Sequence, residues 1–341
     1  MKYIMIYPEY VKKGNVIGIT APSEGNKKET DFTRLNNGKE QLRRRGYEVI
    51  ETAHVRTSNK GRSTDAGTRT KELVELINND NVKWIISAKG GDFLLEMLPL
   101  MDFNHIKANP KWIQGYSDNT GLTYTITTHC DIATLYGCNF NDFGMEVWHK
   151  AMEDNLQLVE GDINTVHSFD QYEDGFYDRI TGLEGYQLEK PVCWRNLQGE
   201  DEISMSGRLL GGCLDVLLHM VGTRFDRTKE FIEKYKENGI LWYLESFALD
   251  SEAITLGLWQ LKEAGWFQYT KGFIFGRPAF FNPNYDISYD EAVLSVLEEF
   301  HVPIILDADI GHKLPQMTIV NGAMAKIHSK DGKGTVSYDF I

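Results

Sequence analysis

The sequence is poor in cysteine, and its few cysteines follow no metal-binding or disulfide pattern. The four residues are Cys130, Cys138, Cys193 and Cys213, with no C-x-x-C pair and no matching histidine spacing. Structural zinc sites and disulfide-rich scaffolds depend on such repeated spacings. We therefore expect four buried, reduced thiols and a protein that uses no metal ion and no cofactor.

Long apolar runs are also missing. The apolar stretch within Met1–Glu9 is too short for a secretory signal, and no small-residue cleavage site follows it. No segment approaches the roughly 20 apolar residues that a membrane-spanning helix needs. We expect a cytoplasmic protein without membrane contact.

Basic charge is scarce relative to acidic charge. The chain has 36 Lys and Arg against 49 Asp and Glu, which gives a net charge of -13. Binding to nucleic acid draws on cationic side chains that neutralise phosphates and release counterions. The balance argues against nucleic acid as a partner.

What is present is an ordinary globular composition in a long chain. The 341 residues are 42% hydrophobic and 25% charged, enough for two domains that each bury a core. We expect an N-terminal α/β domain over residues 1–150, a connection over 151–205, and a C-terminal α/β domain over 206–341.

The order of predicted elements indicates parallel sheets. Strands are predicted at 16–21, 47–50, 82–88, 112–114 and 133–137, with helices near 31–46 and 69–78 between them. In the second half we predict a helix from Ser206 to about Val221, strands at 239–245, 272–276, 303–306 and 317–320, and helices at 251–264 and 289–300. Residues 141–199 show little periodicity, which favours a long connection of the kind that often acts as a lid.

A serine lies where a nucleophile would be expected. The run Trp112–Gly121 contains Gly115-Tyr116-Ser117-Asp118-Asn119, an apolar piece followed by Gly-x-Ser-x and a helix-compatible segment. This resembles the strained turn that exposes a nucleophilic serine, although Asn119 replaces the second glycine of that motif. The alternative is a Ser/Asp cap on an ordinary helix.

A glycine turn follows the strand at 82–88. Gly90 and Gly91 could direct backbone N–H groups at a substrate oxygen, or could simply allow a tight turn. With Asp92 and Phe93 they spell the diguanylate cyclase signature, but that signature belongs on a hairpin, whereas here it opens a helix.

An acid and a histidine complete a candidate triad. Glu245 ends a strongly apolar strand, and His312 lies in a glycine-containing loop beyond the strand at 303–306. Each could also be a solvated residue at the surface. With Ser117 they follow the order Ser, acid, His at the carboxyl ends of strands, which is one of the known triad orders.

Taken together, these motifs resemble the LD-carboxypeptidase family of serine peptidases, family S66, and more closely its microcin C immunity (MccF-like) branch. The matching stretches, spread over nearly the whole chain, are 15–23, 90–91, 115–120, 207–212 with 222–223, 241–245 and 311–312. The resemblance implies a flavodoxin-like N-terminal domain of the class I glutamine amidotransferase type, a C-terminal swivelling β/β/α domain, an active site between them, and a homodimer.

The resemblance also implies a role for each residue. Ser117 would attack the scissile carbonyl, His312 would accept and return the proton, and Glu245 would orient His312. The backbone N–H groups of Gly91 and Asp118 would form the oxyanion hole.

The family cleaves an amide beside a free carboxylate in muropeptides, whereas the immunity branch cleaves peptidyl or aminoacyl nucleotides. In that branch, aromatic side chains on the interdomain loop stack on the base, and Trp194 resembles such a residue by position. Two departures from the family pattern leave the identity of the substrate open. The Gly-Gly turn continues with Asp92-Phe93 in place of Tyr-Gly, and Cys213 stands in place of an asparagine. The alternative from another functional class is a protein that binds a ligand in the same cleft but catalyses no reaction.

Overall fold

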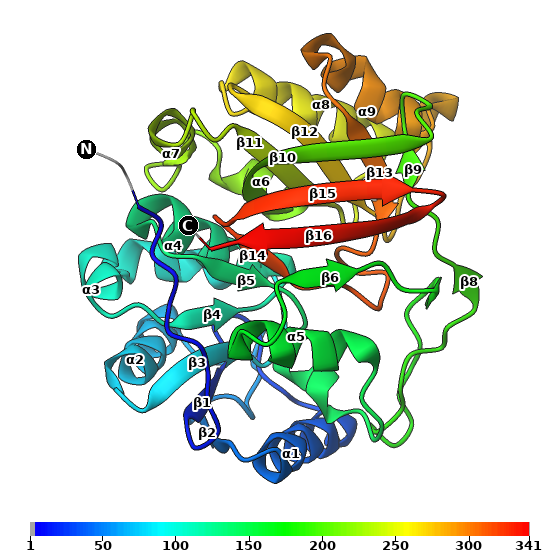
Figure 1. Ribbon diagram of the computed structural model, residues 1–341. Helices are drawn as coiled ribbons and strands as arrows, with labels where there is room; N and C mark the ends of the chain where they lie inside the picture. Colours follow the sequence, from blue (N-terminus) through cyan, green and yellow to red (C-terminus); the bar gives the residue numbers. More distant parts are fainter. Residues whose placement is uncertain (1–3, 341) are drawn as a thin grey trace.

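The computed structural model describes residues 4–340, which form two sheets with helices packed around them (Figure 1). The first sheet has six strands in the order β14-β5-β4-β3-β1-β2. Their bounds are β1 Val16–Thr20, β2 Glu48–Glu51, β3 Val82–Ser87, β4 Trp112–Gln114, β5 Thr134–Tyr136 and β14 Ile319–Asn321. All neighbours except β14 run parallel, so the predicted parallel sheet is confirmed.

Helices follow these strands as expected of βαβ units. The helices α1 (Glu29–Arg44), α2 (Ala66–Asn78) and α4 (Thr120–Cys130) connect successive strands, and the short helix α3 (Phe103–Ala108) precedes β4. All but one residue of α4 are buried, because this helix lies at the junction of the two halves of the molecule (Figure 1). The helix behind Ser117 is therefore held rigidly from both sides.

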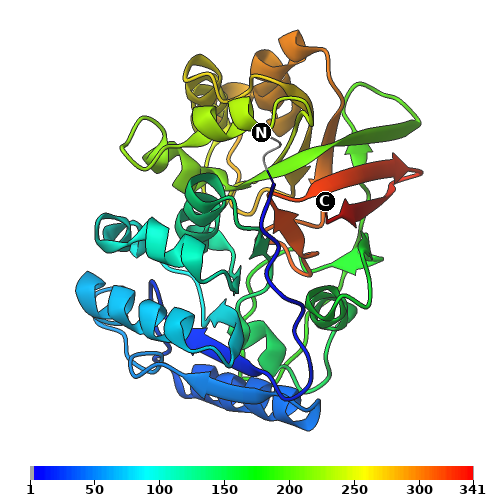
Figure 2. The same cartoon turned by 60° about the vertical axis from the view of Figure 1, so that its left-hand side comes forward.

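The second sheet has eight strands in the order β6-β16-β15-β10-β11-β12-β13-β9. Its parallel centre is β10 (Glu202–Cys213), β11 (Ile240–Glu245), β12 (Thr270–Gly276) and β13 (Ile304–Ala308). Helices α6 (Leu214–Met220), α7 (Thr228–Lys234), α8 (Ser251–Glu263) and α9 (Tyr289–Leu297) connect these strands. This sheet confirms the expected second α/β half, which lies above the first in Figure 2.

Residues 206–213 were predicted as the start of a helix, and this was wrong. They continue the long strand β10, and helix α6 begins only at Leu214. A side chain at Gly211 would place its first carbon 1.7 Å from the Tyr243 carbonyl oxygen. The two glycines thus allow β10 to lie closely against β11 and, at Gly212, against Thr120 of α4.

The strand predicted at 317–320 exists as β14, but it belongs to the first sheet rather than the second. It pairs antiparallel with β5, with Ile319 opposite Tyr136. The chain then returns to the second sheet through the hairpin of β15 (Met324–Lys330) and β16 (Lys333–Asp339), which was not predicted. Through β14 the C-terminal part of the chain is therefore bound into the N-terminal sheet.

The connection over 141–199 is more ordered than its composition suggested. It contains helix α5 (Lys150–Glu160) and the short strands β6 (Thr165–His167), β7 (Gln171–Tyr172), β8 (Lys190–Pro191) and β9 (Arg195–Asn196). Strands β6 and β9 form the two edges of the eight-stranded sheet. Strands of two or three residues are too short to give a periodic signal, which explains why they escaped prediction.

The structure can be compared with two expectations from composition, on membrane-spanning helices and on the cysteines. Within residues 4–340, no helix has both the length and the apolar character required to cross a membrane. All four cysteines are free thiols, but only three are buried, because Cys193 is exposed on the connection.

Candidate active site

Ser117 lies on a strained turn between β4 and α4. Its φ angle is +66°, a left-handed conformation that side-chain-bearing residues seldom adopt outside constrained sites. Ser117 begins a 3-10 turn, Ser117–Asn119, which leads into α4. The geometry agrees with a nucleophile turn and not with an ordinary cap, which would hold extended backbone.

Asn119, the residue that departs from the Gly-x-Ser-x-Gly motif, has a definite structural role. Its buried amide donates hydrogen bonds to the Tyr116 carbonyl at 2.9 Å and to the Lys89 carbonyl at 3.3 Å. The side chain thus ties the serine turn to the glycine turn at Gly90. A glycine at position 119 could not make these contacts.

The glycine turn lies directly against the serine. A side chain at Gly90 would place its first carbon 3.1 Å from the Ser117 Oγ, and one at Gly91 would collide with the Ser23 hydroxyl at 2.3 Å. Close approach therefore requires glycine at position 91 and favours it at position 90, although neither residue has a left-handed φ.

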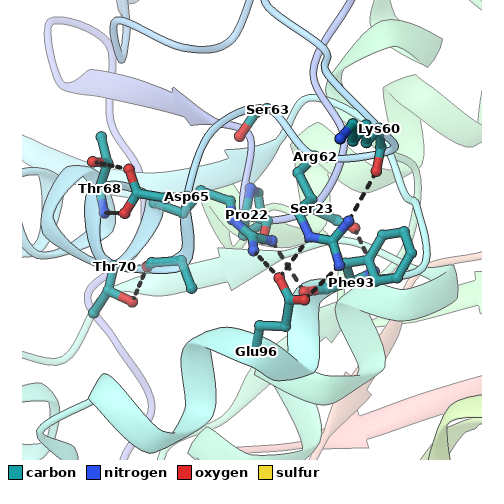
Figure 3. Close-up of polar contacts among 12 residues, drawn as sticks. Pro22, Ser23, Lys60, Arg62, Ser63, Asp65, Thr68, Thr70, Phe93 and Glu96 are labelled. Carbon is teal, nitrogen blue, oxygen red and sulfur yellow. Dashed lines mark hydrogen bonds and ion pairs between the residues drawn. The ribbon is translucent and has the colours of Figure 1, made fainter.

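An ionic network that is partly exposed to solvent holds the glycine turn in place. The Arg69 guanidinium, which is fully buried, donates to the Pro22 carbonyl at 2.8 Å and to the Phe93 carbonyl at 3.1 Å. It also pairs with Glu96, which accepts two hydrogen bonds from Arg62 (Figure 3). The loop at Pro22 and the turn at Gly91 are thereby fixed to each other.

Glu245 and His312 form a buried pair. Glu245 ends β11, His312 follows β13, and the imidazole Nδ1 lies 2.9 Å from the carboxylate Oε2. The exposed fractions of the two residues are 1% and 6%. Gly311, with φ +91°, allows this approach, since a side chain there would lie 2.6 Å from the same oxygen.

The pair favours an ionised carboxylate. Burial raises the pKa of Glu245, but the nearby His312 and hydrogen bonds from His312, Tyr136 and Cys213 lower it more, so the net pKa lies below its ordinary value. A carboxylate in this state can orient the imidazole and stabilise its protonated form.

Aromatic and hydroxyl contacts bring this pair to the serine turn. The ring of Tyr116, the residue before Ser117, packs on the His312 ring with centroids 5.1 Å apart. The Tyr136 hydroxyl accepts a hydrogen bond from the Ser117 backbone N–H at 3.2 Å and donates to Glu245 at 2.6 Å. The structure therefore gathers all three predicted triad residues at the junction of the two halves.

The groups gathered here are a hydroxyl, an imidazole, a carboxylate and backbone amides. Over residues 4–340, no three histidine, cysteine, aspartate or glutamate side chains are placed to hold a metal ion together. This set of groups is the one that nucleophilic acyl transfer uses.

The side chain of Asp118 is an unusual feature of the site. It is 5% exposed, and burial raises its pKa to about 7, an effect that the Ser23 hydroxyl and the Leu94 backbone N–H only partly offset. Asp118 directly follows Ser117, so a carboxyl group that changes charge near neutral pH lies beside the predicted nucleophile.

We expect Asp118→Asn to stabilise the protein more at pH 8.5 than at pH 5. The pKa is about 7 in the folded state and 3.8 ordinarily, so the native carboxyl holds its proton more tightly. The contribution of the Asp118 carboxyl to the free energy of unfolding therefore falls as the pH rises from 3.8 to about 7, by about 4 kcal/mol in total. Urea unfolding at both pH values measures the difference.

Asp92→Asn serves as the matched control, because Asp92 is an exposed carboxyl on the adjacent glycine turn. Its removal should change the free energy of unfolding equally at the two pH values. A gain for Asp118→Asn that is independent of pH would contradict a carboxyl that titrates near neutrality.

Trp194 does not occupy the place predicted for it. Its ring is 2% exposed, its indole N–H donates to Asp309 at 3.0 Å, and a side chain at Gly334 would collide with it. A ring enclosed in this way has no free face for a base. The prediction of stacking by Trp194 is corrected to a structural role beneath the loop that leads to His312.

An aromatic cluster that was not predicted from the sequence lies beside His312. Phe176 of the connection stacks on Phe280 at 5.0 Å, and Phe247 packs edge-on against both rings. Phe247 also lies 4.6 Å from the His312 ring, centroid to centroid. These three phenylalanines are 55%, 37% and 54% exposed in chain order, so they present an apolar surface next to the imidazole. Their only sequence signal is that phenylalanine is unusual in polar loops.

The fold and the site define a serine peptidase-type hydrolase of the α/β class. Two family models match the chain: the LD-carboxypeptidase N-terminal domain over residues 17–137 and the LD-carboxypeptidase C-terminal domain over 206–327. The protein belongs to the LD-carboxypeptidase family, S66, and is a serine-type carboxypeptidase or amidase.

Individual relatives agree with this assignment. A Vibrio cholerae protein named as a carboxypeptidase is 25% identical over 98% of this chain and 96% of its own. The microcin C7 self-immunity protein MccF of Escherichia coli is 25% identical over 87% of this chain and 86% of its own.

Solved structures share the fold along the whole chain. An MccF-like protein from Bacillus anthracis gives a TM-score of 0.79 at 24% identity, covering 98% of this chain and all of its own. MccF in complex with aspartyl sulfamoyl adenosine also gives 0.79, at 22% identity, and covers 98% of this chain and 99% of its own. The predicted fold class is thereby confirmed.

Proposed function

We propose that this protein hydrolyses an amide bond in a small peptide-like substrate by means of a Ser117–His312–Glu245 triad. The observation that carries the proposal is the buried His312–Glu245 pair, with 2.9 Å between nitrogen and oxygen, held beside the left-handed turn of Ser117. Membership of a serine peptidase family favours this function over a non-catalytic binding protein.

In the first half of the reaction, His312 removes the proton from the Ser117 hydroxyl as its oxygen bonds to the substrate carbonyl carbon. The carbonyl π electrons move to the oxygen, and the resulting oxyanion is stabilised by the backbone N–H groups of Gly91 and Asp118. Collapse of this intermediate breaks the C–N bond, and His312 gives its proton to the leaving amine. Water then releases the acyl group by the same steps.

For the substrate we propose a peptidyl or aminoacyl nucleotide, as in microcin C-type self-immunity. The aromatic surface of Phe176, Phe247 and Phe280 supports this choice, because a planar base gains about 1–3 kcal/mol from stacking on such rings. Solved structures of MccF carry aspartyl sulfamoyl adenosine and glutamyl sulfamoyl guanosine, which combine an amino acid with a nucleoside.

The alternative substrate is a murein tetrapeptide, from which the enzyme would release D-Ala as an LD-carboxypeptidase. The names of several relatives favour it, including a murein peptide carboxypeptidase of Bacillus subtilis that is 22% identical over 95% of this chain and 92% of its own. A substrate panel separates the two. The protein is incubated with aspartyl sulfamoyl adenosine and with the tetrapeptide, and products are followed by mass spectrometry. Release of D-Ala alone would reject the nucleotide substrate.

We expect Phe280→Ala to raise KM for aspartyl sulfamoyl adenosine about tenfold, with kcat nearly unchanged. The variant removes the stacking partner of Phe176 and one of the three rings of the apolar surface, while no hydrogen bond of the triad depends on it. Steady-state kinetics on the nucleotide and the tetrapeptide measure the effect.

Trp259→Ala is the matched control, because Trp259 is a half-exposed aromatic residue on α8 that should leave both substrates unaffected. Equal losses on the nucleotide and the tetrapeptide with Phe280→Ala would argue against recognition of a base by this cluster.

A further inference from the structure

Tyr136 makes contacts that none of the proposed catalytic roles uses. It ends β5 in the N-terminal sheet and is fully buried. Its hydroxyl takes part in two hydrogen bonds, as acceptor from the Ser117 N–H at 3.2 Å and as donor to Glu245 Oε1 at 2.6 Å. One atom thus connects the residue of the nucleophile with the carboxylate of the acid.

These two bonds satisfy groups that would otherwise be costly to bury. The Ser117 N–H begins a 3-10 turn and has no partner within that turn, as is normal for a helix start. The Glu245 carboxylate divides its oxygens, with Oε2 toward His312 and Oε1 toward Tyr136. The orientation of this carboxylate is therefore fixed from two directions.

Tyr136 also lies on the seam between the two halves of the molecule. Its partner across the sheet is Ile319 of β14, the strand that the C-terminal part of the chain contributes to the first sheet. Glu245 belongs to the other sheet, and the ring of Tyr243, on the same strand as Glu245, packs on Tyr136 at 5.5 Å. The hydroxyl therefore joins two separately built parts of the site.

We infer that Tyr136 is a positioning residue, which sets the Glu245 carboxylate and the Ser117 turn relative to each other across the seam. This inference rests on the proposed triad and extends it. Without the hydroxyl, the carboxylate can rotate away from the line to His312, and the serine turn loses the acceptor that holds its first N–H. Misplacement of reacting groups by a fraction of an ångström lowers the rate of the chemical step more than it lowers binding.

The expected result is a selective loss of turnover. Tyr136→Phe should lower kcat about 10- to 100-fold, with KM for aspartyl sulfamoyl adenosine or the murein tetrapeptide within about twofold. Tyr243→Phe is the matched control: within residues 4–340 its hydroxyl has no hydrogen-bond partner, so this variant should keep full activity. An unchanged kcat for Tyr136→Phe in a folded protein would overturn the inference.

A double-mutant cycle with Glu245→Gln separates positioning from general damage. If Tyr136 acts through Glu245, adding Tyr136→Phe to Glu245→Gln should cost much less than Tyr136→Phe alone. A purely structural role would give additive losses and a raised KM instead, and that outcome would also overturn the inference.

A second substitution at position 136 separates the loss of the hydroxyl contacts from any unfolding of Tyr136→Phe. Incorporation of 3,5-difluorotyrosine at position 136 keeps the ring and the hydroxyl but changes the strength of the hydroxyl as a donor. A change of kcat by more than twofold without a change in thermal midpoint supports the inference, and no change in kcat contradicts it. Ser117→Ala is measured in parallel: if it stays active, the proposed function fails, whereas if only the Tyr136 variants stay active, the positioning role fails.

Discussion

Replacing Ser117 with alanine is expected to lower kcat by a factor on the order of 10⁴–10⁶ while leaving the protein folded. The variant removes the only atom proposed to bond to the substrate, and the oxyanion donors that remain are backbone groups. The left-handed φ of +66° is retained by alanine, so the strain of the turn does not change greatly. Steady-state kinetics on the substrates identified by the panel measure the loss.

Thermal unfolding of Ser117→Ala provides the first control, and its midpoint should stay within a few degrees of the unmodified protein. Ser246→Ala is the matched second control, because Ser246 is a buried serine directly after Glu245. That variant should retain activity. If Ser117→Ala turned over substrate at the original rate, Ser117 would be removed from the mechanism, and the non-catalytic binding protein would become the better explanation.

The parts of the site that the sequence could predict are those with a local signature. Ser117 follows a strand and precedes a helix, Glu245 ends an apolar strand, and His312 lies in the loop beyond another, so neighbouring residues mark each position as a candidate. The parallel order of strands in the first sheet could be inferred for the same reason, because βαβ units repeat along the chain.

What could not be predicted depends on contacts between distant segments. Tyr136 lies in a short apolar strand with nothing in its neighbourhood that indicates a role for its hydroxyl, and its partner Glu245 is 109 residues away. Trp194 was misinterpreted for the same reason, since its burial beneath Gly334 and Asp309 arises from strands that pair only in the folded chain. The cluster at Phe247 also becomes visible only when three loops meet.

Strand β14, which was predicted in the second sheet but lies in the first, shows the same limit for a whole strand. A three-residue apolar strand carries no information about which sheet it joins, and its neighbours along the chain belong to the second sheet. Its pairing with β5 nevertheless has a functional consequence, because β5 ends in Tyr136. The fold thus places Tyr136, which contacts both the acid and the serine, beside a strand that local patterns assign to the other sheet.

Glu245→Gln is expected to lower kcat roughly 10³- to 10⁴-fold, even though it removes only a charge and preserves shape. The amide can still contact the His312 ring, but it no longer stabilises the protonated imidazole and can favour the wrong tautomer. KM should change little, because Glu245 is 1% exposed and lies behind the histidine. Glu252→Gln, an exposed residue of α8, is the matched control and should be fully active.

The same variant tests the charge state of the buried pair through its stability at acidic pH. The pKa of Glu245 is lowered in the folded state from an ordinary 4.5, so the ionised carboxylate stabilises the fold above that value, and this contribution is lost as the pH falls through the lowered pKa. Unfolding free energies of Glu245→Gln should therefore decline less between pH 6 and pH 3 than those of the unmodified protein. An equal decline would mean that folding does not lower the pKa of Glu245, and a smaller decline in the unmodified protein would mean that the carboxyl is protonated in the native site, where a neutral acid could not hold His312 ready for the proton of Ser117.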